Sequence, residues 1–258
     1  MTGHAPSQSP STGQFPSLAS SAPSPRGCGV ASETSGRAVP GAGEPGLAGV
    51  PWAGIMVLAV AGAVLALVAA PFALPLSEAA TAWLGASGSG AGVDRLGDAG
   101  VASLGLLAAL GIALSRRSPT GEERARWASG LVAAAAAAVA FVVASGLKNV
   151  VREIRPCSEL GLSACPPLND YSWPSNHTAV AVALAVAVVI ASPRLWLRLL
   201  AGLLLVMVLA SRVASGAHWV HDVACGVALG ALASFVVLAA VNAVSVALGR
   251  RRSASETR

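Results

Sequence analysis

Long apolar runs dominate the hydrophobic pattern of this chain. Six of them lie at about 52–74, 99–114, 127–147, 178–191, 195–210 and 223–248, and most are near the roughly 20 residues that a helix needs to cross a hydrocarbon core. The apolar positions are continuous and do not alternate, which argues against a β-barrel. The pattern therefore predicts an all-α, polytopic membrane protein built as a six-transmembrane-helix bundle.

Composition supports a membrane environment. The chain is 54% hydrophobic and 11% charged, whereas about a quarter of the residues of a soluble domain are charged. Its apolar content is mainly Ala, Val, Leu and Gly, which suits helices that pack closely through small side chains. The net charge of +5 comes from scattered arginines that form no dense patch, so we expect no nucleic acid partner.

Three regions follow from the pattern. Residues 1–49 are rich in Ser, Pro and Gly and show no hydrophobic periodicity, so we expect a disordered N-terminal tail that is not a secretory signal peptide. Residues 50–249 hold the six spans, and residues 250–258 form a basic C-terminal tail. Between the first two spans, residues 76–88 have the composition of a short interfacial helix.

Arginine in the short loops predicts the orientation in a cell membrane. Because basic residues favour the cytoplasmic side, we expect both termini to be cytoplasmic, and residues 148–176 and 211–222 to be extracytoplasmic. We expect Arg198, near the start of the fifth run, to snorkel to the lipid headgroups. The arginines that set this orientation are Arg116, Arg117, Arg124, Arg126, Arg194, Arg198, Arg250, Arg251 and Arg252.

The first polar cluster follows the third apolar run and reads KNVVREIRP. Lys148, the only lysine of the chain, and Arg155 are seven residues apart. We expect them to lie on one face of a helix continuing from the third run, with both cations directed at one spot. Ordinary snorkelling of cations at a helix end remains the alternative.

The second cluster, WPSNHT, comes directly before the fourth run. Ser175 and Asn176 are good helix-capping residues after Pro174, and the free amides of a helix start bind anions. His177, on the first turn, is placed to give a proton to a leaving oxygen. A plain helix cap with an incidental histidine is the alternative.

The third cluster, SRVASGAHWVHD, precedes the sixth run. If a helix begins near Gly216, Asp222 lies one turn beyond His218 and accepts a hydrogen bond from one ring nitrogen, leaving the other nitrogen free to attack phosphorus. The Arg212 guanidinium can donate two parallel hydrogen bonds to phosphate oxygens. His221 points about a quarter-turn away, so we expect it to be secondary.

Together the three clusters resemble the signature of the type 2 phosphatidic acid phosphatase (PAP2) superfamily, which includes the vanadium haloperoxidases. That signature is written KxxxxxxRP, PSGH and SRxxxxxHxxxD, and this sequence keeps its order and every fixed spacing. The one departure is Asn176, where the family usually has Gly. The resemblance implies a haloperoxidase-like helical core within the membrane bundle.

The resemblance also implies a role for each matched residue. His218 is expected to be the nucleophile that forms a phosphohistidine, Asp222 its orienting partner, and His177 the general acid and then the base. The expected phosphate cradle consists of Lys148, Arg155, Ser175, the Asn176 amide and Arg212. Because three cations and amides can stabilise a transferring phosphoryl group, and the sequence shows no metal-ligand spacing, we predict a metal-independent enzyme without a cofactor.

An outward site at the membrane edge favours a lipid phosphate as substrate. Our first candidate is a polyprenyl (undecaprenyl) pyrophosphate, followed by phosphatidylglycerophosphate and phosphatidic acid. Alternative enzymes are a lipid phosphotransferase and a phosphatase for small sugar phosphates. The non-enzyme alternative, a membrane transporter or lipid-binding scaffold, is expected to place polar residues at mid-membrane depth.

Two cysteines share the polar loop of the site. A bridge between Cys157 and Cys165 would close a short loop and contribute about 2.5 kcal/mol in an oxidising compartment. Sequence alone leaves the disulfide and two free thiols equally open.

Overall fold

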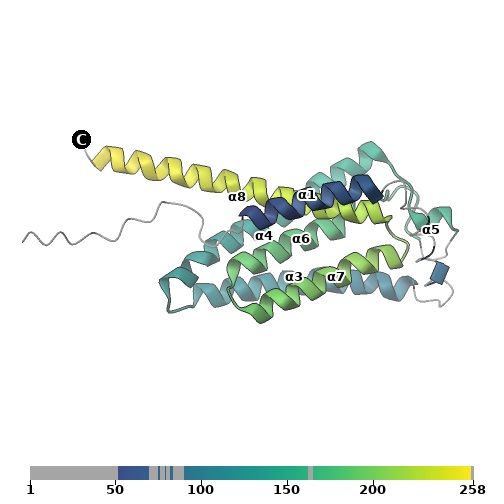
Figure 1. The fold of residues 1–258 in the computed structure, drawn as a ribbon, viewed down its shortest axis with the longest axis horizontal. Coiled ribbons are helices and arrows are strands. Elements are labelled where there is room, and N and C mark those ends of the chain that lie inside the picture. The colour runs from purple at the N-terminus through teal and green to yellow at the C-terminus, as the bar shows by residue number, and fades with distance from the viewer. Residues whose placement is uncertain are drawn as a thin grey trace, which may run out of the picture. The chain divides into compact units, whose positions relative to one another are not determined.

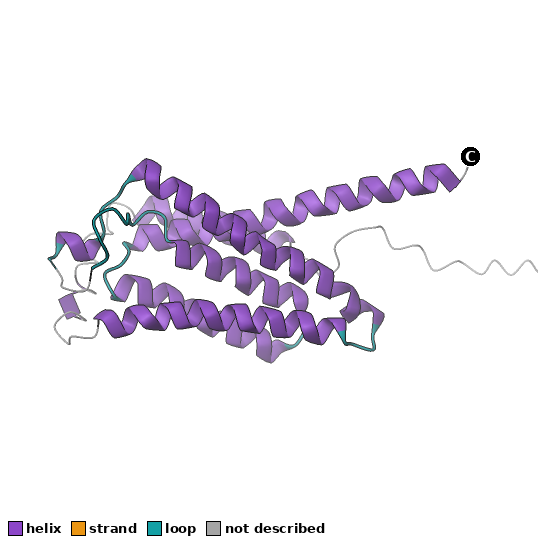
Figure 2. Ribbon diagram, turned by 180° about the vertical axis from the view of Figure 1, so that it is seen from behind, coloured by secondary structure: helices purple, strands orange, loops and turns teal. Residues whose placement is uncertain are grey.

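The computed structural model describes residues 52–69, 75, 79, 82–83, 90–161 and 165–256. Within these ranges every regular element is a helix and no residue lies in a strand (Figure 2). The expected tail at 1–49 lies outside the described residues, as does most of the expected interfacial helix at 76–88.

Six long helices and one short helix follow one another along the described chain (Figure 1). The described residues of each expected apolar run fall on a long helix, and several helices extend into the polar residues that flank their runs, because backbone hydrogen bonding continues past the apolar stretch. The helices are α1 (Trp52–Ala69), α3 (Gly90–Arg116), α4 (Gly121–Val151), α5 (Pro156–Glu159), α6 (Asn176–Ala191), α7 (Leu195–Ala214) and α8 (Val220–Glu256).

The helices have the length and surface of a membrane protein. Within the described residues, four segments are long and apolar enough to cross a bilayer: Gly90–Arg116, Gly121–Glu159, which contains both α4 and α5, Leu195–Ala214 and Val220–Arg251. Large apolar side chains such as Leu106, Val142 and Leu203 are exposed on them, as expected where lipid replaces water. The apolar α6 is shorter, with 16 residues, so a count of six spans remains a prediction.

Helix α6 occupies the centre of the bundle. It packs against α3, α4, α7 and α8, and in Figure 1 it lies between the α1–α8 pair and the α3–α7 pair. Its first residue is Asn176, and the side chain of Ser175 caps it by accepting a hydrogen bond from the Thr178 N–H at 3.4 Å. This confirms the helix start that the second motif predicts.

Glycines on α8 allow its backbone to lie directly on the first turns of α6. A Cβ atom at Gly226 would lie 2.8 Å from the Ser175 carbonyl oxygen, and one at Gly230 would collide with the Ala179 carbonyl oxygen. The two glycines are four residues apart, a spacing that brings helix backbones together in membranes. The close contact fixes the start of α6 against the start of α8.

The arginine-rich loops meet at one end of the bundle. Ser115 Oγ donates a hydrogen bond to the Ala191 carbonyl, which joins the end of α3 to the end of α6. Arg198 donates to the carbonyls of Ser192 at 2.9 Å and Val189 at 3.2 Å. Its guanidinium satisfies carbonyls left free at the end of α6, and the snorkelling of Arg198 to the headgroups remains a prediction.

The three motifs meet at the opposite end. The Cys157 N–H donates to the Gly216 carbonyl at 2.9 Å, the Ser175 N–H donates to the Asp222 carbonyl at 3.2 Å, and the Trp219 indole donates to the Ile154 carbonyl at 3.0 Å. These bonds join the first motif to the third and the second to the third. Which end faces the cytoplasm remains a prediction.

Candidate active site

A cavity of about 390 Å³ opens where the three motifs meet. Six of the eight predicted phosphate and catalytic residues line it, and Ser175 and Asp222 are not among the lining residues. The predicted residues on its wall are Lys148, Arg155, Asn176, His177, Arg212 and His218, and they share the wall with Asp94, Asp98, Pro166, Asp170 and Ala217.

Lys148 and Arg155 converge, but not along one helix face. Helix α4 ends at Val151, and Arg152 adopts a left-handed conformation with φ 56° while its N–H caps the Lys148 carbonyl. Arg155 therefore lies beyond the helix, and the expectation of a continued helix is wrong. The two cations come together instead around Asp170, whose Oδ1 lies 3.6 Å from Lys148 Nζ and 2.9 Å from Arg155 Nη2.

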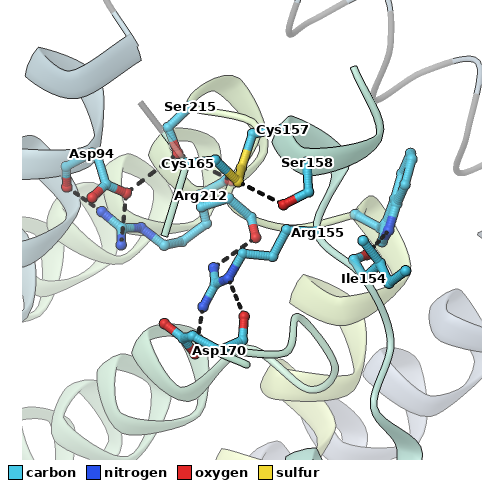
Figure 3. The surroundings of a disulfide bond; sticks show 11 residues. Asp94, Ile154, Arg155, Cys157, Ser158, Cys165, Asp170, Arg212 and Ser215 are labelled. Atoms are coloured by element: carbon cyan, nitrogen blue, oxygen red, sulfur yellow. Dashed lines mark hydrogen bonds and ion pairs between the residues drawn. A yellow bond between two sulfur atoms is a disulfide. The ribbon is translucent and has the colours of Figure 1, made fainter. Parts of the chain in front are cut away.

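Loop carbonyls hold the same two cations in place. Arg155 donates to the carbonyls of Asp170 at 2.7 Å and Ala217 at 2.8 Å (Figure 3), and Lys148 donates to the Tyr171 carbonyl at 2.5 Å. Burial raises the pKa of the Asp170 carboxyl, but Arg155 and Lys148 outweigh it and hold that pKa below its usual value. The two cations are thus positioned before any phosphate binds, and they share one carboxylate.

Arg212 lies in the last turn of α7 and is 2% exposed. Its Nη1 lies 3.1 Å from Asp94 Oδ1, and its Nη2 donates to the Asp94 carbonyl (Figure 3). The same Nη1 lies 3.5 Å from Asp98 Oδ1. Sequence reasoning missed both carboxylates. The available signal was two acidic residues, four apart, at the start of a mainly apolar helix, because acidic groups at a membrane boundary need partners.

The guanidinium of Arg212 lies against Gly97 of α3. A Cβ atom there would lie 2.5 Å from Ser211 Oγ and would collide with the guanidinium. The absence of a side chain at Gly97 therefore makes the space in which Arg212 reaches the cavity.

His177 and Asn176 form the α6 side of the cavity. His177 Nε2 lies 2.9 Å from Asp98 Oδ1, so Asp98 contacts both the expected general acid and Arg212. Asn176, which stands where the resembling family usually has Gly, donates from Nδ2 to Ser145 Oγ of α4 at 3.0 Å. Its side chain thus links α6 to α4 beside the cavity.

The Ser175 side chain caps helix α6 in this structure. The residue is fully buried, and its Oγ accepts hydrogen bonds from the Thr178 N–H at 3.4 Å and the Thr178 hydroxyl at 3.1 Å. The structure does not bring this hydroxyl to the cavity wall, so its expected place in the phosphate cradle remains a prediction.

His218 and Asp222 are close, in a geometry other than the expected one. Gly216 takes a positive φ of 71° and α8 begins at Val220, so the expectation of a helix from near Gly216 is wrong and His218 precedes the helix. Asp222 Oδ2 accepts the Trp219 N–H at 2.8 Å, as a third-position acid does at a helix start. The same oxygen lies 3.5 Å from His218 Nδ1, and that nitrogen has no hydrogen-bond partner.

His218 is 2% exposed and close to the cations of the site. Burial lowers the pKa of its imidazole well below 6.5, and the charges of Arg155 and Lys148 lower it further. A neutral imidazole keeps a free lone pair at neutral pH. With Asp222 facing Nδ1, the other ring nitrogen, Nε2, is the one suited to nucleophilic attack.

A further polar cluster lies beside Asp222. His221 Nε2 lies 2.8 Å from Glu153 Oε1 and 3.4 Å from Asp222 Oδ1, so His221 contacts the carboxylate that faces His218. The three residues offer ligand atoms within 4.8 Å of one another, a grouping that sequence spacing did not reveal because Glu153 lies on another element. Metal independence therefore remains a prediction.

The loop of the first motif is closed by a disulfide. Cys157 on α5 and Cys165 are bonded, with a Cα–Cα distance of 5.5 Å, and the Ser158 hydroxyl lies 3.0 Å from the Cys165 sulfur (Figure 3). Of the two possibilities left open by the sequence, the structure has the bridge. It ties α5 to the segment that leads to Asp170.

Comparisons with known proteins bear on the same part of the chain. Residues 128–245 match the sequence profile of the PAP2 superfamily, and this range contains all three motifs. An undecaprenyl-diphosphatase from Sulfolobus acidocaldarius is 34% identical over 100 residues, which are 38% of this chain and 48% of that protein, so the match spans about half of the relative's length. No solved structure matches the chain. The match of residues 128–245 to the PAP2 superfamily confirms the resemblance seen in the motifs.

Proposed function

We propose that this protein is a membrane phosphatase that hydrolyses lipid phosphates or diphosphates through a phosphohistidine on His218. The observation that carries the proposal is one cavity of about 390 Å³ lined by three cations and two histidines. These residues come from three separate segments of the chain and are Lys148, Arg155, His177, Arg212 and His218.

The chemistry follows from their roles. Nε2 of His218 attacks phosphorus, the bond from phosphorus to the leaving oxygen breaks, and His177 gives that oxygen a proton. Water then attacks the phosphohistidine while His177 accepts a proton from it, the phosphorus–nitrogen bond breaks, and phosphate leaves. The cations of the wall stabilise the charge of the transferring group, so we expect no metal requirement.

In the ligand-free site each cation is paired with a carboxylate. Asp170 pairs with Lys148 and Arg155, and Arg212 pairs with Asp94. A substrate phosphate must replace these partners, so binding is an exchange of one anion for another. Exchange keeps the cations from being left buried and unpaired, which would be costly.

A second, apolar cavity supports a lipid substrate. It measures about 160 Å³ and is lined by Val101, Phe141 and Val180 together with Asn176 and His177. Asn176 and His177 also line the polar cavity, so the apolar space adjoins the residue proposed to protonate the leaving group. The chain of an amphiphilic leaving group fits this position, since its tail would reach the lipid phase between α3 and α4.

A polyprenyl diphosphate is our first candidate substrate, because the relative described above carries the name undecaprenyl-diphosphatase. An extracytoplasmic site is part of the proposal. The disulfide at this end of the bundle supports it, since disulfides persist in oxidising compartments.

The test is phosphate release by the purified protein in detergent, without any acceptor other than water. The panel contains undecaprenyl diphosphate, phosphatidylglycerophosphate, phosphatidic acid and glucose 6-phosphate. We expect release from the lipids, inhibition by vanadate, no effect of EDTA, and an alkali-stable phosphoenzyme that accumulates in His177→Ala and is absent in His218→Ala. Wild-type rates in His218→Ala would contradict the proposal, as would phosphate transfer that requires a second lipid acceptor.

A further inference from the structure

We infer that Glu153 and His221 are positioning residues for the nucleophile and act on His218 through Asp222. The inference rests on the proposed function, because it concerns the orientation of the nucleophile in that reaction. Neither residue lines the substrate cavity, and neither belongs to the fixed positions of the three motifs. The geometry behind His218 points to them.

The Asp222 carboxylate is shared between two imidazoles. Asp222 is fully buried, its Oδ2 accepts the Trp219 N–H and faces His218 Nδ1 at 3.5 Å, and its Oδ1 lies 3.4 Å from His221 Nε2. Oδ1 has no hydrogen-bond partner, and two polar side chains act on this carboxylate, His221 through its ion-pair contact and the buried Ser172 through its hydroxyl. Without His221, the carboxylate keeps the Trp219 backbone hydrogen bond and the interaction with Ser172, but loses its contact with a second imidazole.

Glu153 holds His221 in that position. Glu153 Oε1 lies 2.8 Å from His221 Nε2, a hydrogen-bond distance. The backbone of Glu153 is itself fixed, because its carbonyl accepts the Ser172 N–H at 2.8 Å. The nitrogen that faces Asp222 is therefore held by a carboxylate from a different part of the chain.

The segment of Glu153 also holds both chain neighbours of His218. The Ile154 carbonyl accepts the Trp219 indole N–H at 3.0 Å, and Arg155 donates to the Ala217 carbonyl at 2.8 Å. Ile154 and Arg155 thus hold the Trp219 side chain and the Ala217 backbone on the two sides of the nucleophile. The Glu153 side chain, through His221, supports the Asp222 carboxylate that faces the His218 ring.

The expected effect is on the reaction and not on substrate binding. In Glu153→Gln or His221→Ala, Asp222 loses part of its support, and His218 spends less time in the orientation that aims Nε2 at phosphorus. Loss of one charge-assisted hydrogen bond predicts a fall in kcat of roughly 10- to 100-fold. We expect KM to change less than about threefold, because neither side chain touches the cavity and uniform binding is kept.

The two substitutions test one interaction, so they should not add. A Glu153→Gln/His221→Ala double variant is expected to have about the kcat of His221→Ala alone, since Glu153 acts through His221. Glu159→Gln is the matched control, because Glu159 is an exposed carboxylate on α5 of the same loop region. It should keep the wild-type kcat. Gel filtration and thermal unfolding in detergent show whether each variant is folded.

The outcomes separate the inference from the proposed function. An active wild type with unchanged kcat in folded Glu153→Gln and His221→Ala contradicts the inference alone, and so does a rise in KM at constant kcat. Stimulation of the wild type by added Zn²⁺ or Mg²⁺ that both variants lose also overturns it, because the cluster would then bind a metal. A wild type without phosphate release on any substrate contradicts both proposals.

Discussion

Replacing Gly97 by alanine should impair phosphate binding while leaving the fold intact. The new Cβ would collide with the Arg212 guanidinium and lie 2.5 Å from Ser211 Oγ. Both neighbours are side-chain atoms, so they can move without displacing a helix. The side chain that moves, however, is the one that presents a guanidinium to the cavity.

The contacts at Gly97 set the expected changes in vanadate binding and in stability. A hydrogen bond between charged groups contributes roughly 1.5–3 kcal/mol, so displacement of Arg212 from one phosphate oxygen predicts vanadate binding about 10- to 150-fold weaker. Stability should not fall, because alanine is favoured over glycine in a helix by about 0.5–1 kcal/mol, and this gain offsets the cost of moving a flexible side chain.

The assay is vanadate inhibition of phosphate release, paired with thermal unfolding in detergent. Gly92→Ala is the matched control, since Gly92 lies on the same helix and a Cβ there has no atom within 4 Å. We expect wild-type inhibition in Gly92→Ala and weak inhibition in Gly97→Ala at similar unfolding temperatures. Equal inhibition constants in the two variants would refute the assignment of Arg212 to phosphate.

Three further predictions concern packing and pH. Gly230→Val should destabilise the bundle by roughly 1–3 kcal/mol, because the new side chain would meet a backbone carbonyl of α6. The control Gly202→Val, in open space, should not destabilise it. Equal unfolding temperatures of the two variants would contradict this. Since His218 has a pKa well below 6.5 and must be neutral to attack, the fall of kcat/KM on the acid side should begin below pH 6.5, where pH drops through that lowered pKa. Lys148→Met removes a positive charge that lowers the pKa of His218, so the acid-side fall of the normalised kcat/KM profile should move to higher pH. An unmoved profile would count against this electrostatic argument. Asp170 has a lowered pKa and is half exposed, so Asp170→Asn should cost about 0.5 kcal/mol of stability. This contribution is present above pH 3.8, the ordinary pKa of aspartate, and is lost as pH falls through the lowered folded value. Equal unfolding of variant and wild type at pH 7 would contradict it, and so would a much larger loss.

The sequence was sufficient to predict the helices and the meeting of the three motifs at one site. Length and continuity of the apolar runs determine a membrane helix, and each run falls on a helix of the structure. The capping residue Ser175 located the start of α6 because cap chemistry is local. Fixed motif spacings named residues that line one cavity.

Local periodicity failed where the chain leaves the helix. A seven-residue spacing suggested one helical face for Lys148 and Arg155, but the left-handed Arg152 ends α4 between them. The four-residue spacing of His218 and Asp222 suggested a helical pair, but Gly216 turns the chain and α8 starts later. In both places the residues still converge, because loop hydrogen bonds replace the helix.

The carboxylates of the site were beyond sequence reasoning for a different reason. Asp98 reaches His177 from a helix almost eighty positions earlier in the chain, and Glu153 reaches His221 across 68 positions. Pairing at such separations depends on helix packing, which no local pattern encodes. Asp170 lies in a loop without periodicity, where only tertiary contacts give it a role.

The bridge between Cys157 and Cys165 links the assembly of the cavity to the conditions of folding. The segment after Cys165 supplies the Asp170 and Tyr171 oxygens that hold Lys148 and Arg155. Protein folded where thiols stay reduced is expected to lack this tether, so a preparation can contain two populations that differ by two hydrogen atoms. Counting free thiols before an assay would then report which fraction of the molecules has its cation-holding loop closed.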